Sequence, residues 1–386
     1  MNQEKSLKQT AILVIHGIGE QFPFQTLDSF TSAFWKYMEE TKNGIQYRGS
    51  YHIKARQDWT QSFISLSAQT EHGDEKSSVD IYEYYWAYKP QGVVKVKDII
   101  DWLIYTSKGA GKFYEQHPEI VKKYKQKNIP AFKKDKFKEY GYLNILGWYM
   151  EIFSWLGSIL DVFGLVVPVN IIKVFTPIIK WLEKKAIDYI GDIVIYTTND
   201  MKSKFFKVRT EILYGAVEEI KQLLEDEKYE RIIIAGHSLG SVIAYDALNR
   251  INLGMNTGKI SRSLSKKIIG LVTFGSPLDK IAFFFSEQTK DNESLRRQII
   301  AQYHGFRKLP YILKEKEKKL DQTIELLLNK VQWINFYDVK DKVSGNLDFY
   351  EVDENVDLEM ESTVAEAHMN YWNNKKLFKK IIQQYF

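Results

Sequence analysis

Short apolar runs and longer amphipathic segments alternate along most of the chain. The runs are rich in β-branched and aromatic residues and are bounded by glycine or polar residues, which is typical of buried strands. They predict strands at Ala11–Ile15, Tyr51–Ala55, Phe63–Ala68, Val79–Ala87, Asp192–Thr197, Arg231–Ala235, Ile268–Phe274 and Val331–Tyr337. Apolar residues at helical spacing predict helices at Thr26–Glu40, Lys202–Glu227, Ser241–Ile251, Asn292–His304, Leu313–Lys330 and Asn374–Gln384. This alternation predicts an α/β fold with a mostly parallel sheet and helices on both of its faces.

One pair of strands departs from the parallel pattern. The runs Phe63–Ala68 and Val79–Ala87 are separated by the polar turn sequence TEHGDEKSS. A short polar connection between two apolar runs favours a hairpin, so we expect these two strands to pair antiparallel.

The stretch 96–190 does not follow the alternation. Residues 112–140 hold nine lysines against four acidic residues, and residues 141–182 hold only four charges. A helical segment that is apolar on all sides is buried in protein or in lipid, and adjacent lysines attract anionic lipid. Three interpretations stay open: a cap on the α/β domain, peripheral membrane contact through 112–182, or a spanning hairpin. The longest uncharged run there, 11 residues, is short for a span.

The predicted organisation is therefore one discontinuous domain with an insertion. Residues 8–95 and 191–386 form the α/β domain, and residues 96–190 form a helical, apolar and lysine-rich insertion. The first apolar run, Ala11–Ile15, is too short for the core of a signal peptide. We therefore expect a cytoplasmic protein, with membrane association through the insertion as the alternative.

Composition removes several classes of function. The 386 residues include no cysteine, which excludes a disulfide scaffold, a thiolate metal site and a cysteine nucleophile. The formal net charge of +5 is too mild to indicate nucleic acid as a partner. Aromatic residues make up 14% of the chain, which requires large buried faces, an apolar ligand surface or a membrane interface.

A candidate nucleophile follows one predicted strand directly. The run RIIIA leads into Gly236-His237-Ser238-Leu239-Gly240, and the helical segment SVIAYDALNR comes next. This is G-x-S-x-G between a strand and a helix, where glycines permit a sharp turn that exposes the serine hydroxyl. The helix N-terminus beside it stabilises developing negative charge. The pattern predicts Ser238 as a nucleophile.

An acyl-transfer site also needs two backbone N–H groups aimed at the oxyanion of the tetrahedral intermediate. The N–H of Leu239, the residue after the nucleophile, is the first candidate. The first strand ends in His16-Gly17-Ile18-Gly19, a turn that brings backbone close to substrate. We expect the second donor at Ile18, with Gly17 as the alternative. His16 is expected to orient this turn.

Three segments together resemble the lipase and serine-esterase branch of the α/β-hydrolase superfamily. They are AILVIHGIG, GHSLG and VTFGSPLD, in that order. The chain is similar in particular to bacterial hydrolases of the phosphatidylinositol-deacylase type, to which VDIYEYYWA and GDIVIYT also correspond. The resemblance covers residues 8–95 and 190–375 and not the insertion. It implies an α/β-hydrolase fold with a helical cap insertion.

In that superfamily the serine comes first in the chain, then the acid, then the histidine, and this order reduces the number of candidates for the acid and the base. Of seven histidines, only His304 and His368 follow the nucleophile. The strand VQWINFY leads into Asp338 and Asp341, and the resemblance favours Asp341 with His368 as base. Asp338 stays open as the acid. Asp279 is a further candidate for the acid, with His304 as its base.

These residues predict a serine hydrolase that cleaves carboxylic esters, of lipid or of another apolar acyl group, through an acyl-enzyme. The mechanism needs no metal and no cofactor. An acyltransferase or thioesterase with the same triad is the first alternative. A membrane-associated interaction protein with a degenerate site is the second.

Overall fold

The computed structural model describes residues 9–17, 22–41, 46–55, 60–68, 78–89, 132–133, 136–137, 204–279, 293–308, 313, 317–341, 344–361 and 367–386. Two compact units divide the chain. One comprises Met1–Lys89, Thr210–Asp279 and Asp291–Phe386, and the other comprises Pro90–Arg209 and Lys280–Lys290. In the second unit, β5 (Phe132–Lys133) pairs with β6 (Lys136–Phe137). The expected strand at Asp192–Thr197 and the rest of the predicted insertion 96–190 lie outside the described residues.

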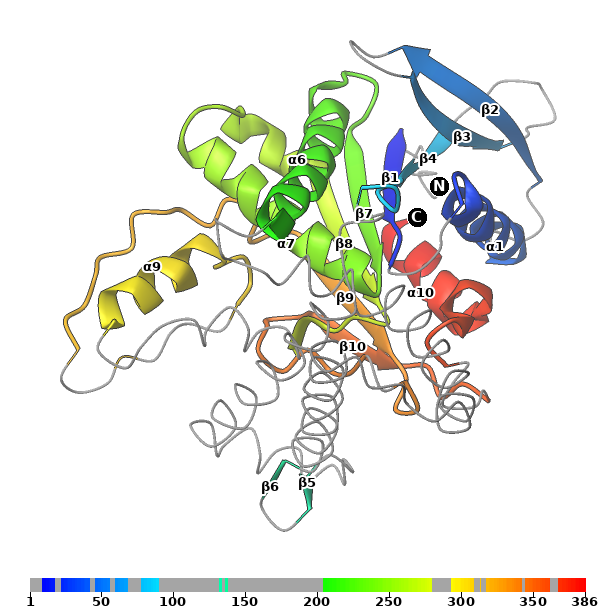
Figure 1. Ribbon diagram of the computed structural model, residues 1–386. Coiled ribbons are helices and arrows are strands. Elements are labelled where there is room, and N and C mark those ends of the chain that lie inside the picture. Colours follow the sequence, from blue (N-terminus) through cyan, green and yellow to red (C-terminus); the bar gives the residue numbers. More distant parts are fainter. Residues whose placement is uncertain are drawn as a thin grey trace, which may run out of the picture. The chain divides into compact units, whose positions relative to one another are not determined.

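An eight-stranded sheet organises the first unit, in the order β10-β9-β8-β7-β1-β4-β3-β2 (Figure 1). Its strands are β1 (Thr10–Ile15), β2 (Tyr47–Ala55), β3 (Thr60–Ala68), β4 (Ser78–Tyr84), β7 (Arg231–His237), β8 (Ile268–Phe274), β9 (Gln332–Tyr337) and β10 (Glu354–Asp357). From β4 to β10 every neighbouring pair is parallel. The pairs β3–β4 and β2–β3 are antiparallel, which confirms the predicted hairpin. The mostly parallel sheet of an α/β fold is confirmed as well.

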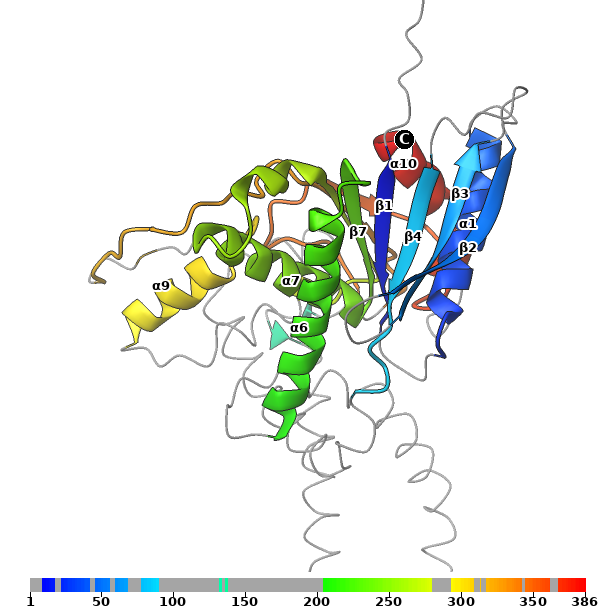
Figure 2. The ribbon, with the colours of Figure 1, turned by 90° about the horizontal axis from the view of Figure 1, so that it is seen from above.

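Helices cover both faces of this sheet. The helices in the described residues are α1 (Gln25–Thr41), α6 (Lys204–Glu225), α7 (Leu239–Asn256), α9 (Ser294–Tyr303) and α10 (Lys375–Tyr385), with 3-10 turns η1 (Arg262–Lys267) and η2 (Asn370–Asn373); α9 lies away from the sheet (Figure 1). Figure 2 shows α6 and α7 on one face and α1 with α10 on the other. The aromatic side chains of α1 and α10 meet in the core: the rings of Phe30 and Phe378 lie 5.3 Å apart, edge to face. Both rings are fully buried.

The central strands are buried on both faces, which explains why their sequences are continuous apolar runs. Every residue of β1 is buried, and its apolar residues are fully inaccessible to solvent. Such strands cannot alternate polar and apolar residues, because no face of theirs meets water. The carboxyl ends of these parallel strands share one edge of the sheet, where loops after β1, β7, β8 and β9 come together.

One predicted helix is wrong. Residues 317–330, within the expected helix Leu313–Lys330, form extended chain and a turn. The side-chain amide of Asn252 binds the backbone of Glu325 and Leu327, and Asn256 also binds both backbone groups of Glu325. On α9, Gln298 binds the backbone of this segment in the same way, at Lys318 and Leu320. These side-chain amides take the hydrogen bonds that a helix would have satisfied internally.

The remaining expected helices in the described part of the chain are present, with ends shifted by a few residues. The strand expected at Val79–Ala87 ends at Tyr84, since the backbone N–H of Trp86 donates to a ring nitrogen of His16 and not to a neighbouring strand. The strand β10 was not expected. None of the helices in the described residues has the length and apolar composition needed to cross a membrane.

Candidate active site

The sharp turn that follows β7 places Ser238 at the carboxyl edge of the sheet. Ser238 has φ 51° and ψ −127°, a strained backbone for a residue with a side chain. The helix α7 begins at the next residue, Leu239. A Cβ on Gly236 would lie 2.5 Å from the Cα of Ser241, and one on Gly240 would lie 2.2 Å from the carbonyl oxygen of Ile15. Both glycines are therefore required by close packing of backbone around the turn.

Ser238 and His368 are in hydrogen-bond contact, although they are 130 residues apart in the chain. The Nε2 atom of His368 lies 2.8 Å from Oγ of Ser238. The Nδ1 atom of the same ring lies 2.9 Å from Oδ2 of Asp341. A carboxylate only accepts, so Nδ1 carries the proton and Nε2 is left to accept the serine proton. The structure thus joins Ser238, His368 and Asp341 in one line of hydrogen bonds.

The two other candidate acids bind backbone groups. Asp338 accepts from the backbone N–H groups of Lys340 (2.8 Å) and Met360 (2.5 Å) and thereby shapes the loop that carries Asp341. Asp279 accepts from two consecutive backbone N–H groups, those of Asp348 and Phe349. Both carboxylates thus hold loop backbone at the carboxyl edge of the sheet.

The alternative base, His304, lies elsewhere. It follows α9, and its Nδ1 atom is 3.4 Å from Oδ1 of the buried Asp246. Its carbonyl oxygen accepts from the hydroxyl of Tyr245. His304 and Asp279, the expected alternative pair, thus each bind other groups: His304 faces Asp246, and Asp279 binds backbone N–H groups.

The turn after β1 lies directly against the nucleophile. In the parallel register Ile15 pairs with Gly236, so the next two residues, His16 and Gly17, run alongside His237 and Ser238. A Cβ on Gly17 would come within 2.6 Å of the Cβ of Ser238. Any side chain at this position would therefore displace the nucleophile or the turn. The expected donors Gly17 and Leu239 thus flank Ser238, whereas Ile18 lies outside the described residues.

His16 is buried and clamps this turn. Its Nε2 accepts from the backbone N–H of Trp86, and its Nδ1 donates to the carbonyl of Gly17 at 2.8 Å. The indole of Trp86 stacks on the imidazole at 4.9 Å and donates to the carbonyl of His16. Burial lowers the pKa of His16 to about 4, so the ring is neutral at physiological pH. This neutral ring orients the turn and does not contact Ser238.

His237, the residue before the nucleophile, is also neutral. Burial, and then the nearby His368, lower its pKa to about 3. Its Nε2 donates to the carbonyl of His368 at 3.0 Å, which anchors the backbone of the base to the turn of the nucleophile. The sequence motif indicated a turn at this position but not this anchoring contact.

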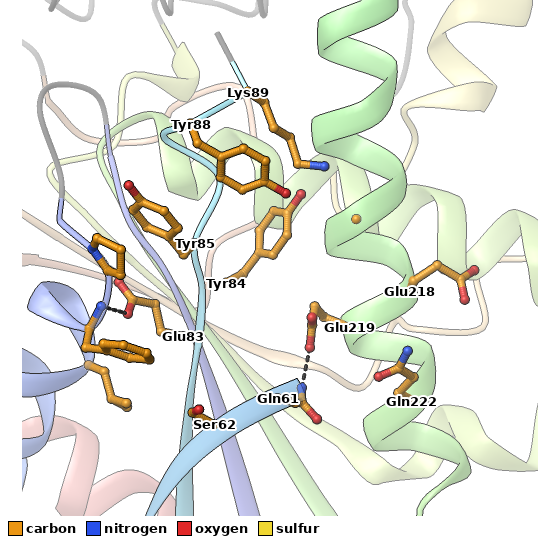
Figure 3. Close-up of a pocket in the computed structure, with 14 residues that line it drawn as sticks. Gln61, Ser62, Glu83, Tyr84, Tyr85, Tyr88, Lys89, Glu218, Glu219 and Gln222 are labelled. Atoms are coloured by element: carbon orange, nitrogen blue, oxygen red, sulfur yellow. Dashed lines mark hydrogen bonds between the residues drawn. The ribbon is translucent and has the colours of Figure 1, made fainter. Parts of the chain in front are cut away.

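A pocket of about 540 Å³ lies beside the end of β4 (Figure 3). It is lined by Pro23, Phe24, Leu27, Gln61, Ser62, Glu83, Tyr84, Tyr85, Tyr88, Lys89, Gly215, Glu218, Glu219 and Gln222. Figure 3 shows Glu83 turned toward the backbone N–H of Phe24, and Gln61 bonded to Glu219 at the opposite wall. Burial raises the pKa of Glu83 to about 6, against the hydrogen bonds that it accepts. The lining residues do not include Ser238, His368 or Asp341. This pocket is therefore distinct from the site that those three residues form.

The fold and the turn define the class of the protein. A sheet of this order, with a strained serine between a central parallel strand and a helix, is the architecture of an α/β-hydrolase. A family model described as lipase (class 3) matches residues 170–291, which include the turn and β8. Over these residues the chain is similar to class 3 lipases, and its sheet and helices form the α/β fold of that family. No curated protein and no solved structure matches the chain.

Proposed function

We propose that the protein is a serine hydrolase that cleaves carboxylic esters through a triad of Ser238, Asp341 and His368. The observation that carries this proposal is the unbroken line of hydrogen bonds from the serine hydroxyl through the imidazole to the carboxylate. All three residues are buried at the carboxyl edge of the sheet, where the ligands of such folds bind.

The mechanism follows from these contacts. The Nε2 of His368 takes the proton of Ser238 as its Oγ attacks the ester carbonyl. Asp341 holds the imidazole tautomer and stabilises the cation that forms. The His368 cation then protonates the leaving alcohol. In the second step His368 takes a proton from water as the water attacks the acyl-enzyme, and it returns this proton to Oγ of Ser238 as the acid leaves.

The oxyanion of the tetrahedral intermediate would form between Ser238 and the turn after β1. The N–H of Leu239, at the start of α7, is one proposed donor. The second is the N–H of Ile18, with that of Gly17 as the alternative. One observation supports a role for this turn: His16 and Trp86 hold its backbone, since Nδ1 of His16 binds the carbonyl of Gly17 and the indole of Trp86 binds the carbonyl of His16.

Two observations favour apolar acyl esters, lipid esters included, as substrates. The match to the class 3 lipase model covers the nucleophile region. The sequence of the predicted insertion is strongly apolar, with four charges in residues 141–182. The resemblance to the phosphatidylinositol-deacylase type agrees with a lipid ester.

A chain-length series of p-nitrophenyl esters, from acetate to palmitate, tests the proposed reaction and its substrate class. We expect turnover that increases with acyl length and that Ser238→Ala abolishes. No turnover of any ester, or equal turnover by wild type and Ser238→Ala, would contradict the proposal. A preference for acetate would contradict only the apolar substrate.

Peripheral membrane contact through residues 112–182 is a separate proposal, and the sequence alone supports it. A segment with nine lysines precedes the apolar stretch, which suits anionic lipid. Flotation with vesicles of phosphatidylcholine, with and without phosphatidylserine, tests it. We expect binding only to the anionic vesicles and release at high salt; no binding to either kind contradicts it.

A further inference from the structure

A tyrosine contacts the proposed triad from the side opposite the nucleophile. Tyr371 lies in η2, three residues after His368, and its hydroxyl is 2.8 Å from Oδ2 of Asp341. This oxygen is the same one that faces Nδ1 of His368. Because a carboxylate only accepts, the tyrosine donates to it. One carboxylate oxygen thus receives hydrogen bonds from both the base and the tyrosine.

The direction of the next hydrogen bond is also fixed. Burial, and then the charge of Asp341, raise the pKa of Tyr371, so its hydroxyl keeps its proton at physiological pH. The Oγ of Ser344 lies 2.9 Å from the tyrosine hydroxyl. The single O–H of Tyr371 already donates its hydrogen bond to Asp341. Ser344 must therefore be the donor in its hydrogen bond with the tyrosine oxygen. The chain therefore runs from Ser344 through Tyr371 to the carboxylate.

The ring of Tyr371 is held rigidly. It is fully buried, and its centroid lies 6.2 Å from that of Phe274. A Cβ on Gly275, which has φ +64°, would lie 3.1 Å from the tyrosine ring and 3.3 Å from the ring of His368. The end of β8 thus packs against both rings. A side chain fixed in this way delivers its hydroxyl to one place.

We propose that Tyr371 is a positioning residue of the triad. Its hydroxyl holds the carboxylate of Asp341 in place and, by donating a hydrogen bond to it, weakens the electrostatic attraction between this carboxylate and the imidazolium of His368. This inference rests on the proposed function, because the triad must work for its support to matter. Tyr371 contacts neither substrate nor the reacting atoms. It acts through Asp341, whose orientation sets the tautomer of the base.

Removing the hydroxyl has two consequences with known directions. The carboxylate loses an anchor, so the base is held less well and the reaction slows at every pH. The carboxylate also keeps more of its negative charge, which stabilises the protonated form of His368. The acidic limb of the pH–rate profile then moves to higher pH. Two further groups lie near the base or the tyrosine: His237, which is neutral, and Asp338, which acts on Tyr371 and is bound by backbone N–H groups. Neither is altered by the substitution.

Tyr371→Phe tests the inference, since it keeps the ring and removes only the hydroxyl. The rate of labelling by a fluorophosphonate measures the reactivity of Ser238 without any assumption about the natural substrate. We expect labelling at the plateau to slow about tenfold, with an upward shift of the acidic limb of about half a pH unit. Hydrolysis of the best p-nitrophenyl ester should fall in kcat with little change in KM, because no substrate contact is removed.

Tyr385→Phe is the matched control. This tyrosine is buried in the same core and donates to the carbonyl of Gln332, away from the triad. We expect it to cost stability in urea unfolding to a similar degree while leaving the rate and the pH profile unchanged. If Tyr371→Phe is labelled at the wild-type rate and the acidic limb of its pH–rate profile lies at the wild-type pH, the inference is wrong.

Ser344→Ala covers the case in which Tyr371→Phe does not fold. It removes the donor to Tyr371, so labelling should slow about threefold with a limb shift in the same direction. An unchanged rate in a folded Ser344→Ala then overturns the inference. Failure of the proposed function is distinct from either result, because wild type itself would not be labelled.

Discussion

Asp341 and Asp80 are both buried carboxylates that accept a hydrogen bond from a tyrosine hydroxyl, yet they lie at opposite edges of the sheet. Asp341 follows β9 at the carboxyl edge and is bound by Tyr371 at 2.8 Å. Asp80 lies near the start of β4, opposite Ala11 of β1, and is bound by Tyr229 at 2.6 Å. Each carboxylate thus has a tyrosine as one partner, and the two carboxylates differ in their other partner.

The second partner of each carboxylate accounts for the difference in role. The Oδ2 of Asp80 also binds Nζ of Lys228, so the network ends in an ion pair. The Oδ2 of Asp341 faces the imidazole of His368, whose other nitrogen contacts the hydroxyl of Ser238. A buried carboxylate with a tyrosine is therefore not sufficient for catalysis. A titratable ring and a nucleophile at the carboxyl edge must complete it.

The largest expected difference between the two edges concerns the carboxylates themselves. Asp341→Asn should lower kcat about 10⁴-fold, because the amide no longer holds the required tautomer of His368. The free energy of unfolding of this variant, measured in urea, should change little. Asp80→Asn should leave kcat within about twofold and lower the free energy of unfolding by about 1–3 kcal/mol. The loss stays moderate because the Lys228 side chain, 38% exposed, can turn toward water.

Ester hydrolysis and urea unfolding of the two variants check this reversal. Activity retained in Asp341→Asn, or lost in a folded Asp80→Asn, would remove the distinction between the two carboxylates.

The next effect concerns the turn beside the nucleophile. Gly17→Ala places a Cβ where the Cβ of Ser238 lies, so either the nucleophile or a proposed oxyanion donor must move. We expect kcat to fall about 10²-fold or more, the loss that follows from one missing donor. Gly258→Ala is the control: φ is +77° there and nothing lies within 4 Å, so it should cost about 1 kcal/mol of stability and no activity. Equal kcat in the two variants would contradict the role of the turn.

A smaller effect distinguishes the neutral histidines at the catalytic edge from the base. The pKa of His16 is about 4 in the folded protein and about 6.5 when unfolded, so the unfolded chain binds more protons between these values. Stability is therefore complete above pH 6.5 and falls as the pH drops toward 4, by up to about 3 kcal/mol for this group. His237 acts in the same direction.

Urea unfolding at a series of pH values measures this slope. In His16→Gln, the fall in stability between pH 6.5 and 4 should become shallower, whatever the absolute stability of the variant. An unchanged slope would show that His16 is not buried as a neutral ring.

The smallest expected effect concerns the histidine that the structure places away from the nucleophile. His304→Gln should change kcat by no more than about twofold, since the ring faces Asp246, whereas His368 contacts Ser238. Steady-state ester hydrolysis checks this. A loss of two orders of magnitude would point to His304 as the base and would put the contact of Asp341 with His368 in doubt.

The sequence predicted the central strands best, because their burial on both faces leaves continuous apolar runs. It missed β10, whose four residues ENVD include three polar ones and lie at the edge of the sheet. It predicted a helix where residues 317–330 form none, since the amides of Asn252, Asn256 and Gln298 reach that segment only in the folded chain. Contacts of this kind leave no periodic pattern.

The candidate site shows the same limit. Ser238 and His368 could be named from a local motif and from chain order. Asp338 and Asp341 could not be separated by position, because they lie three residues apart in one loop. The structure separates them by their partners: backbone N–H groups bind the first, and the imidazole and a tyrosine contact the second. Tyr371 gave no signal in the sequence, since its role depends on that contact.

Labelling with a fluorophosphonate, followed by mass mapping of the modified peptide, tests the central claim most directly. Wild type should carry one adduct, on Ser238, and Ser238→Ala of unchanged circular dichroism should carry none. Asp341→Asn should label far more slowly than wild type, and Asp80→Asn should label at the wild-type rate. Labelling that persists in Ser238→Ala, or a wild type that is never labelled, would contradict the account.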